Sequence, residues 1–173
     1  MKKKGYLIFI SIIVTYLCIL IIFEYSKKPK EIEMQDVTVF ENYTVKLPLK
    51  ANQVGKNRWK IEYSSSFTTI IASELPPIGS LNSFMDMALK KNDSDKFKLY
   101  LNSKKEIDKP TYKIYINYYK GKAGASPLSS PISFTCLILD EINTKNRFMF
   151  ELNSIDSGHD HIVDSIVNSF KKK

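Results

Sequence analysis

Cysteine and histidine are scarce in this sequence, with two residues of each among 173. Cys18 lies inside an uncharged apolar segment, so the rest of the chain has Cys136 as its single thiol. One thiol cannot close an intrachain disulfide, and the fold must therefore be stabilised by a hydrophobic core. Because the residues around Cys136 are mainly apolar, we expect its side chain to be buried.

Metal-binding patterns are also weak. The His-Asp-His run at 159–161 could place two ring nitrogens on a metal such as zinc, but no third histidine or cysteine supports that site. We favour a helix start here, with Asp160 near the positive end of the helix dipole. Residues 92–95 resemble the opening of a calcium loop, yet Lys98 and Lys104 stand where the loop needs glycine and glutamate. We expect neither a metal nor a cofactor.

Signatures of nucleophilic catalysis are missing as well. The turn-rich stretch 121–131 has neither phosphate-loop nor nucleophile-elbow spacing, and its Ser126 has no evident base. This stretch is either a plain connector or a loop that contacts a partner. An alternative is a hydrolase that uses carboxylates such as Asp140, Glu141 or Asp164, which would have to converge in a pocket. We predict no catalytic residue, since the first two fall at a hairpin end.

Residues 5–23 form the longest run without a charged residue, and nearly all of them are apolar. As a helix they would span about 28 Å, close to the roughly 30 Å hydrocarbon core of a bilayer. The run lacks a small-residue cleavage site, and Cys18 follows Tyr16 and Leu17 rather than small residues,. We therefore predict an uncleaved signal anchor and, as a partner, the lipid bilayer. Representative residues of the predicted anchor are Gly5, Leu7, Ile10, Val14, Cys18, Ile21 and Phe23.

The lysines flanking this segment are balanced, so they do not decide its orientation,. A short basic tail before the first apolar segment is the usual signal-anchor arrangement, and we place the amino terminus in the cytoplasm. The predicted layout is a basic tail (1–4), the anchor (5–23), a polar linker (24–35) and one domain (36–173). We predict a single-pass protein of a bacterial inner membrane whose domain faces outward.

The formal net charge of +8 lies largely in lysine runs at the two termini. The body of the domain is nearly balanced, so nucleic acid is not an expected partner. Lysines and tyrosines are nevertheless interleaved between residues 90 and 122. They could contact a protein or an anionic lipid, or simply keep the surface soluble. The candidate partner-binding residues are Lys96, Lys98, Tyr100, Lys113, Tyr115, Tyr119, Lys122 and Ser126.

Apolar and polar residues alternate in several segments, a pattern typical of strands with one wet face. Such strands are predicted at 43–48, 59–63, 67–73, 96–101, 112–119, 132–139 and 147–152, the last two as a hairpin. Two amphipathic helices are expected, one capped by Ser80 and one over 162–170. The predicted fold class is α+β, with a twisted, mainly antiparallel sheet of about six or seven strands, two packed helices and the N-terminal transmembrane helix.

The sequence resembles the PsbP/Mog1-like superfamily in three features. These are the order of its elements, the opening strand Tyr-Thr-Val-Lys-Leu-Pro (43–48) and the closing Ser-Ile-Val-Asn-Ser-Phe (165–170). The resemblance covers residues 37–170. No Gly-Trp follows Pro48, and Lys109-Pro110 stands where the family usually has glycine. The resemblance implies a small binding or assembly-assisting module without a common active site.

Together these observations predict a membrane-anchored protein that is not an enzyme. Its outward domain would bind or assist another envelope protein, as an immunity protein or as an assembly or transport accessory. The alternatives are the carboxylate hydrolase and a carrier of a small ligand, which would show a large apolar cavity under the sheet.

Overall fold

A computed structural model of the chain describes residue 15 and residues 32–64, 66–93, 97–123, 130–155 and 158–173. It divides the chain into two units, Met1–Glu33 and Met34–Lys173. Within the described residues no helix has the length and apolar character needed to cross a membrane. The predicted anchor lies outside the described residues except for Thr15.

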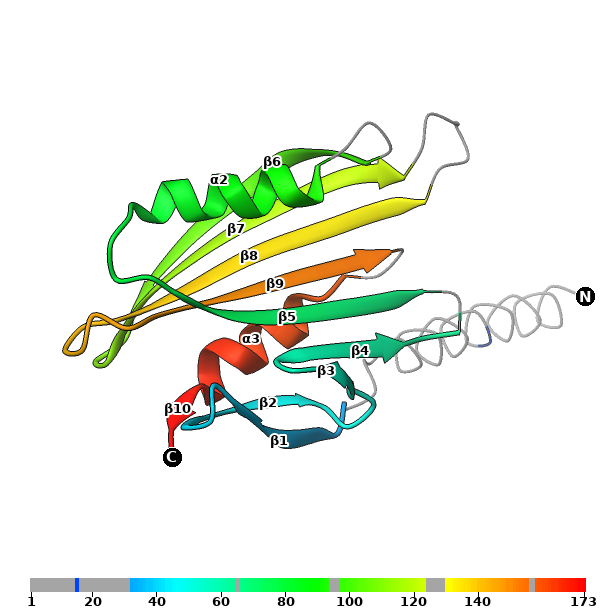
Figure 1. The fold of residues 1–173 in the computed structure, drawn as a ribbon. Helices are drawn as coiled ribbons and strands as arrows, with labels where there is room; N and C mark the ends of the chain where they lie inside the picture. Colours follow the sequence, from blue (N-terminus) through cyan, green and yellow to red (C-terminus); the bar gives the residue numbers. More distant parts are fainter. Residues whose placement is uncertain (1–14, 16–31, 65, 94–96, 124–129, 156–157) are drawn as a thin grey trace, which may run out of the picture. The chain divides into compact units, whose positions relative to one another are not determined.

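A sheet of seven strands in the order β3-β4-β5-β9-β8-β7-β6 forms the framework of the second unit (Figure 1). All its neighbouring strands are antiparallel. Its strands are β3 (Asn52–Gly55), β4 (Arg58–Glu62), β5 (Phe67–Leu75), β6 (Phe97–Asp108), β7 (Tyr112–Ala123), β8 (Pro131–Glu141) and β9 (Arg147–Ile155). The interior strand β8 is buried on both faces from Phe134 to Leu139, as its apolar sequence predicted.

A second, smaller sheet has the order β1-β2-β10, with strands Met34–Val39, Tyr43–Pro48 and Lys171–Lys172. The single-sheet prediction is therefore wrong for the strand at 43–48, which pairs with β1 along its whole length. β1 begins at Met34, inside the segment predicted as a linker. The chain's last residues return to β2, so both ends of the unit meet in this sheet.

Helix α2 (Leu81–Asn92) covers one face of the large sheet. Ser80 caps it as predicted, since its Oγ accepts a hydrogen bond from the Ser83 N–H at 3.1 Å. Phe84, Met85 and Ala88 pack on side chains of β7, β8 and β9. The Cys136 side chain is fully buried in this layer, and burial raises the pKa of its thiol to about 12. The thiol is therefore protonated and unreactive at neutral pH.

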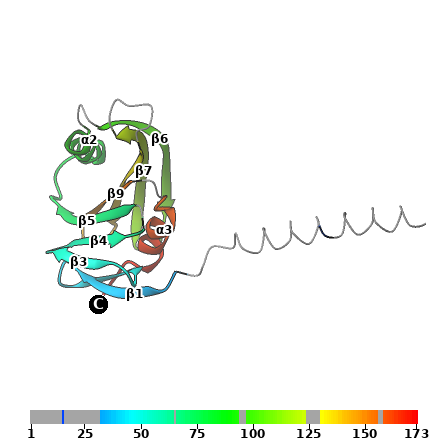
Figure 2. The ribbon, with the colours of Figure 1, turned by 90° about the vertical axis from the view of Figure 1, so that its right-hand side faces the viewer.

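Helix α3 (Asp160–Ser169) covers the opposite face (Figure 2). Ile162, Val163 and Ile166 are fully buried in one core that the large sheet, the small sheet and α3 share. Phe170, just after the helix, contacts four aromatic rings, those of Tyr43, Tyr112, Phe148 and Phe150. The two predicted helices thus cover different faces of one sheet.

Candidate functional site

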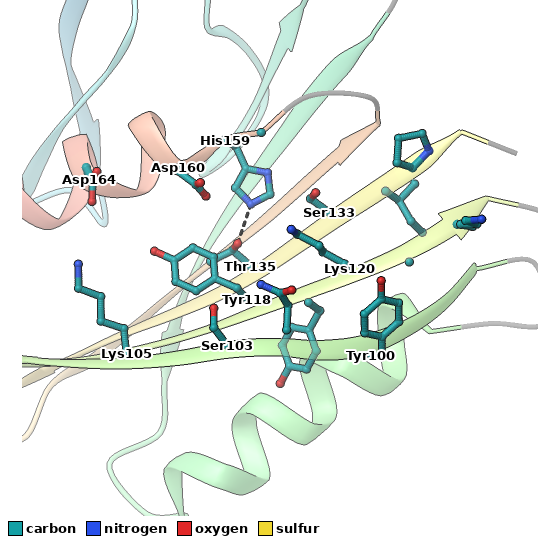
Figure 3. Close-up of a pocket in the computed structure, with 17 residues that line it drawn as sticks. Tyr100, Ser103, Lys105, Tyr118, Lys120, Ser133, Thr135, His159, Asp160 and Asp164 are labelled. Carbon is teal, nitrogen blue, oxygen red and sulfur yellow. Dashed lines mark hydrogen bonds between the residues drawn. The ribbon is translucent and has the colours of Figure 1, made fainter.

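Helix α3 leaves part of its sheet face uncovered, at the end where β6 begins and β7 ends. A hollow of about 710 Å³ lies there, walled on one side by the first turn of α3 (Figure 3). We call it the β6–β7 groove. Its polar lining includes Tyr100, Ser103 and Lys105 of β6, Tyr118, Lys120 and Lys122 of β7, Ser133 and Thr135 of β8, and His159, Asp160 and Asp164 of the α3 region.

The strand register brings lysines together at the open end of this groove. Lys98 lies directly opposite Lys122, and Tyr100 lies opposite Lys120. These residues are spaced by two along their strands, so their side chains share one face of the sheet. Among the described residues, none of the three lysines has a carboxylate within ion-pair distance. Within the described part of the chain, the open end is therefore a cluster of lysines without a paired carboxylate.

Gly121 permits the close approach of β6 and β7 at this cluster. A Cβ atom at this position would lie 2.2 Å from the Lys98 carbonyl oxygen, a backbone atom that cannot rotate away. A register shift between Leu101 and Ser103 follows on β6. This bulge changes which residues of β6 face the groove.

His159 forms part of the groove wall but is only 1% exposed. Its Nε2 lies 2.6 Å from Thr135 Oγ1 (Figure 3), and its Nδ1 lies 2.7 Å from Ser154 Oγ. Ser154 Oγ continues this chain to Thr68 Oγ1 at 2.7 Å. Burial lowers the pKa of His159 to about 4, so the imidazole is neutral at pH 7. It joins the α3 start to β8 and β9.

Two carboxylates line the inner end of the groove. Asp160 and Asp164 are one helical turn apart on the exposed side of α3. Burial raises the pKa of Tyr118, and the charges of both carboxylates raise it further, which places this phenol near them. Lys105 of β6 points toward the same end (Figure 3), without an ion pair to either carboxylate. The groove thus has a basic open end and a mainly acidic inner end.

The three residues of the His-Asp-His motif lie in different environments in the fold. His159 is the N-cap residue but its side chain makes no capping bond, while Asp160 lies in the first turn as expected. His161 Nε2 is buried and has no hydrogen-bond partner among the residues that the structure describes, and burial lowers the pKa of this ring. Over the described residues, no group of three histidine, cysteine or carboxylate side chains could hold a metal ion.

The carboxylates considered for hydrolysis do not converge. Asp140 accepts a hydrogen bond from Arg147 Nε at 3.1 Å. Glu141 accepts hydrogen bonds from Tyr43 at 3.2 Å, Asn146 at 3.1 Å, and Thr144. Both therefore stabilise the β8–β9 hairpin end, where they were expected, whereas Asp164 lines the β6–β7 groove. The groove's polar lining also differs from the large apolar cavity expected of a ligand carrier.

The fold divides the predicted partner-binding residues between two faces. Lys98, Tyr100 and Lys122 meet at the open end of the groove. The side chains of Lys113 and Tyr115 belong to the α2 side of β7, where Tyr115 packs against the core. Lys96 and Ser126 lie outside the described residues.

Tyr119 also belongs to the α2 side of the sheet. Its ring is 4% exposed and stacks on Phe134, and its hydroxyl accepts a hydrogen bond from Asn117 Nδ2 at 3.0 Å. Tyr118 and Lys120 were not among the predicted partner-binding residues. Tyr118, Lys120 and Lys122 follow one another at intervals of two along β7, and this spacing is the signal that could have identified the first two.

No protein-family model matches the sequence. No curated protein matches it either. Among solved structures, the Ran-binding protein Mog1p of Saccharomyces cerevisiae matches with a TM-score of 0.54 and 9% identity, over 82% of this chain and 96% of that chain. The fold is that of Mog1 and PsbP. Cyanobacterial PsbP from Synechocystis matches with a TM-score of 0.52 and 14% identity, over 84% of this chain and 96% of that one.

The PsbP/Mog1 fold was predicted from the order of elements and from the two short motifs at 43–48 and 165–170, and these matches confirm it. Identities this low establish the fold alone.

Proposed function

We propose that this chain is a non-enzymatic protein-binding module, held in a bacterial inner membrane by residues 5–23 with its domain outside the cytoplasm. The observation that carries the binding role is the β6–β7 groove, an open hollow with many polar and charged lining residues. At its open end Lys120 and Lys122 line the hollow and Lys98 lies opposite Lys122, and none of the three has an ion-pair partner among the described residues. The shared fold supports this role, since one similar structure is a Ran-binding protein.

The partner in this proposal is another envelope protein, which the domain either inhibits, as an immunity protein does, or assists in assembly or transport. The support for the membrane location is the uncharged segment 5–23 and its missing cleavage site. A polar linker would let the domain reach a neighbour in the same membrane.

Cross-linking in native membranes tests the binding role. We expect the anchored chain, treated with a short lysine-reactive cross-linker, to yield one dominant adduct that mass spectrometry identifies as an envelope protein. The matched control carries residues 1–33 fused to an unrelated domain and should yield no such adduct. Equal adduct patterns from both chains would contradict a binding role for the domain.

Reporter fusions test the orientation. We expect a periplasm-dependent phosphatase fused after Lys173 to be active and a cytoplasm-dependent fluorescent reporter at the same position to be dark. The opposite pattern would place the domain in the cytoplasm and contradict the envelope role.

A further inference from the structure

Three lysines at the open end of the β6–β7 groove repel one another. Lys98 and Lys122 are cross-strand neighbours, and Lys120 lies one side-chain position along the same face of β7. Like charges directly opposite each other destabilise a strand pair. In the described part of the chain, no carboxylate within ion-pair distance offsets this repulsion. An anionic group bound between these lysines would remove it.

The inner end of the same groove has the opposite character. Asp160 and Asp164 project from α3, and among the described residues Lys105 is the lysine of β6 that lines the groove with them (Figure 3). A ligand that lies along the groove therefore meets positive charge at one end and mainly negative charge at the other. Tyr100, which is 62% exposed, adds a flat aromatic surface at the basic end.

This charge arrangement distinguishes between two anionic partners. A bilayer rich in anionic lipid is flat and negative throughout, so Asp160 and Asp164 would repel it wherever the lysines attract it. A peptide segment can enter a concave surface and vary its charge along its length. The concave shape and the two carboxylates thus favour a peptide.

We propose that the β6–β7 groove binds an extended acidic segment of a partner protein, with its carboxylates on Lys98, Lys120 and Lys122 and a neutral or basic residue beside Asp160 and Asp164. This inference rests on the proposed function, because it names the surface and the partner chemistry of that binding role.

Peptide binding to the full-length chain in phosphatidylcholine nanodiscs tests the proposal. The probe is a fluorescein-labelled dodecapeptide in which glutamate and serine alternate over the first six residues and serine and glycine alternate over the last six. Its binding is followed by fluorescence anisotropy at low and physiological salt. We expect binding at low salt that weakens as salt is added. A peptide with lysine in place of glutamate should not bind. Absence of binding of the acidic peptide at low salt would overturn the proposal.

A pair of charge-matched variants locates the binding surface. Lys120→Glu/Lys122→Glu should weaken acidic-peptide binding by about fivefold or more. The control, Lys50→Glu/Lys104→Glu, makes the same change in net charge at exposed lysines outside the groove and should change affinity by less than about twofold. Equal losses in the two variants would show a general charge effect and overturn the proposal.

Two further measurements test whether the effect comes from charge reversal and whether the partner is a lipid surface. Lys120→Gln/Lys122→Gln removes the two charges without reversing them. This variant should fold with an unchanged thermal midpoint and lose less affinity for the acidic peptide than the glutamate variant does. Unchanged peptide affinity in this folded variant would overturn the proposal. Phosphatidylglycerol vesicles are the second probe. Tighter binding to these vesicles than to the peptide, abolished by Lys120→Glu/Lys122→Glu, would identify a lipid surface and also overturn it.

The proposal and the function on which it rests fail differently. Peptide binding at the groove without any cross-linked partner in native membranes would contradict the proposed function alone. A cross-linked partner whose capture is unaffected by Lys120→Glu/Lys122→Glu would contradict the groove alone.

Discussion

His159 is a buried neutral residue whose protonation opposes folding. Burial lowers its folded pKa from 6.5 to about 4, the nearby Asp160 carboxylate works against this shift, and His161 adds to it. The unfolded chain therefore binds the proton more readily, so the stabilisation is complete above about pH 6.5 and is lost as the pH falls toward about 4.

We expect the wild type to lose about 3 kcal/mol of unfolding free energy over this range from His159. His161 should contribute in the same direction, because burial also lowers its pKa. His159→Gln should cost about 1 to 3 kcal/mol at neutral pH, by disturbing the bonds to Thr135 and Ser154,. Urea unfolding as a function of pH measures both effects. An equally steep acid loss in His159→Gln would exclude His159 as its source.

Gly121 occupies a position where no side chain fits between β6 and β7. In Gly121→Ala the new Cβ would meet the Lys98 carbonyl at 2.2 Å, so β6 must move away from β7. We expect a loss of about 2 kcal/mol in unfolding free energy and faster hydrogen exchange in β6. Gly158→Ala is the control, because a Cβ there meets nothing within 4 Å. Equal stability of the two variants would contradict the close-approach argument.

At the scale of the element, α3 is secured at its carboxyl end. Lys109 Nζ donates hydrogen bonds to the Val167 carbonyl at 2.6 Å and to Asn168 Oδ1 at 3.0 Å. Phe170 then turns into the aromatic cluster, where its ring stacks on Tyr43 with centroids 5.2 Å apart. The helix end is therefore held by the Lys109 ammonium, which bonds the Val167 carbonyl and the Asn168 side chain, and by the buried ring of Phe170,.

Phe170→Ala should lower the free energy of unfolding by about 3 to 5 kcal/mol, since the truncation leaves a cavity among four aromatic rings. Chemical denaturation followed by tryptophan fluorescence of the buried Trp59 measures this loss. Tyr100→Ala, at an exposed ring, should change stability by less than about 0.5 kcal/mol. A small effect at Phe170 would mean that the cluster does not hold α3 in place.

Helix α2 is tied to the sheet by a buried carboxylate. Glu151 of β9 is 2% exposed; its Oε1 lies 3.2 Å from Lys91 Nζ, and its Oε2 accepts a hydrogen bond from Asn92 Nδ2 at 3.0 Å. Glu151→Ala should cost about 1 to 3 kcal/mol and speed hydrogen exchange in the last turn of α2. Lys91→Ala, which keeps the Asn92 bond, should have a smaller effect. Unchanged exchange in α2 would contradict this role.

At the scale of the whole molecule, residues 34–173 contain both hydrophobic cores and form a unit of their own. We expect this segment, expressed without residues 1–33, to unfold in one cooperative transition at the same temperature as the full chain in detergent. A chain that starts at residue 43 lacks β1 and should unfold at a lower temperature, because β2 loses its partner. Circular dichroism measures both. A lower midpoint for 34–173 would show that the first unit contributes to its stability.

Strand alternation and helix caps predicted most elements of this unit. β3 could not be predicted in this way, because all four of its residues are exposed and give no apolar signal. β10 has two residues and exists only through pairing with β2. The split into two sheets was also out of reach, since the partner of the strand at 43–48 is set by long-range contacts rather than by its own pattern.

The sequence by itself determined which segments are extended or helical, where α2 begins, and that Cys136 would be buried, because periodicity and caps act over a few residues. Only the tertiary structure decided which tyrosines and lysines share a face, because a bulge near Asn102 shifts one strand against the next. The tertiary structure also decided that His159, a possible metal ligand in the sequence, is buried and bonds Thr135 of β8 and Ser154 of β9. Such outcomes depend on contacts between residues far apart in the chain, and the β6–β7 groove is one of them.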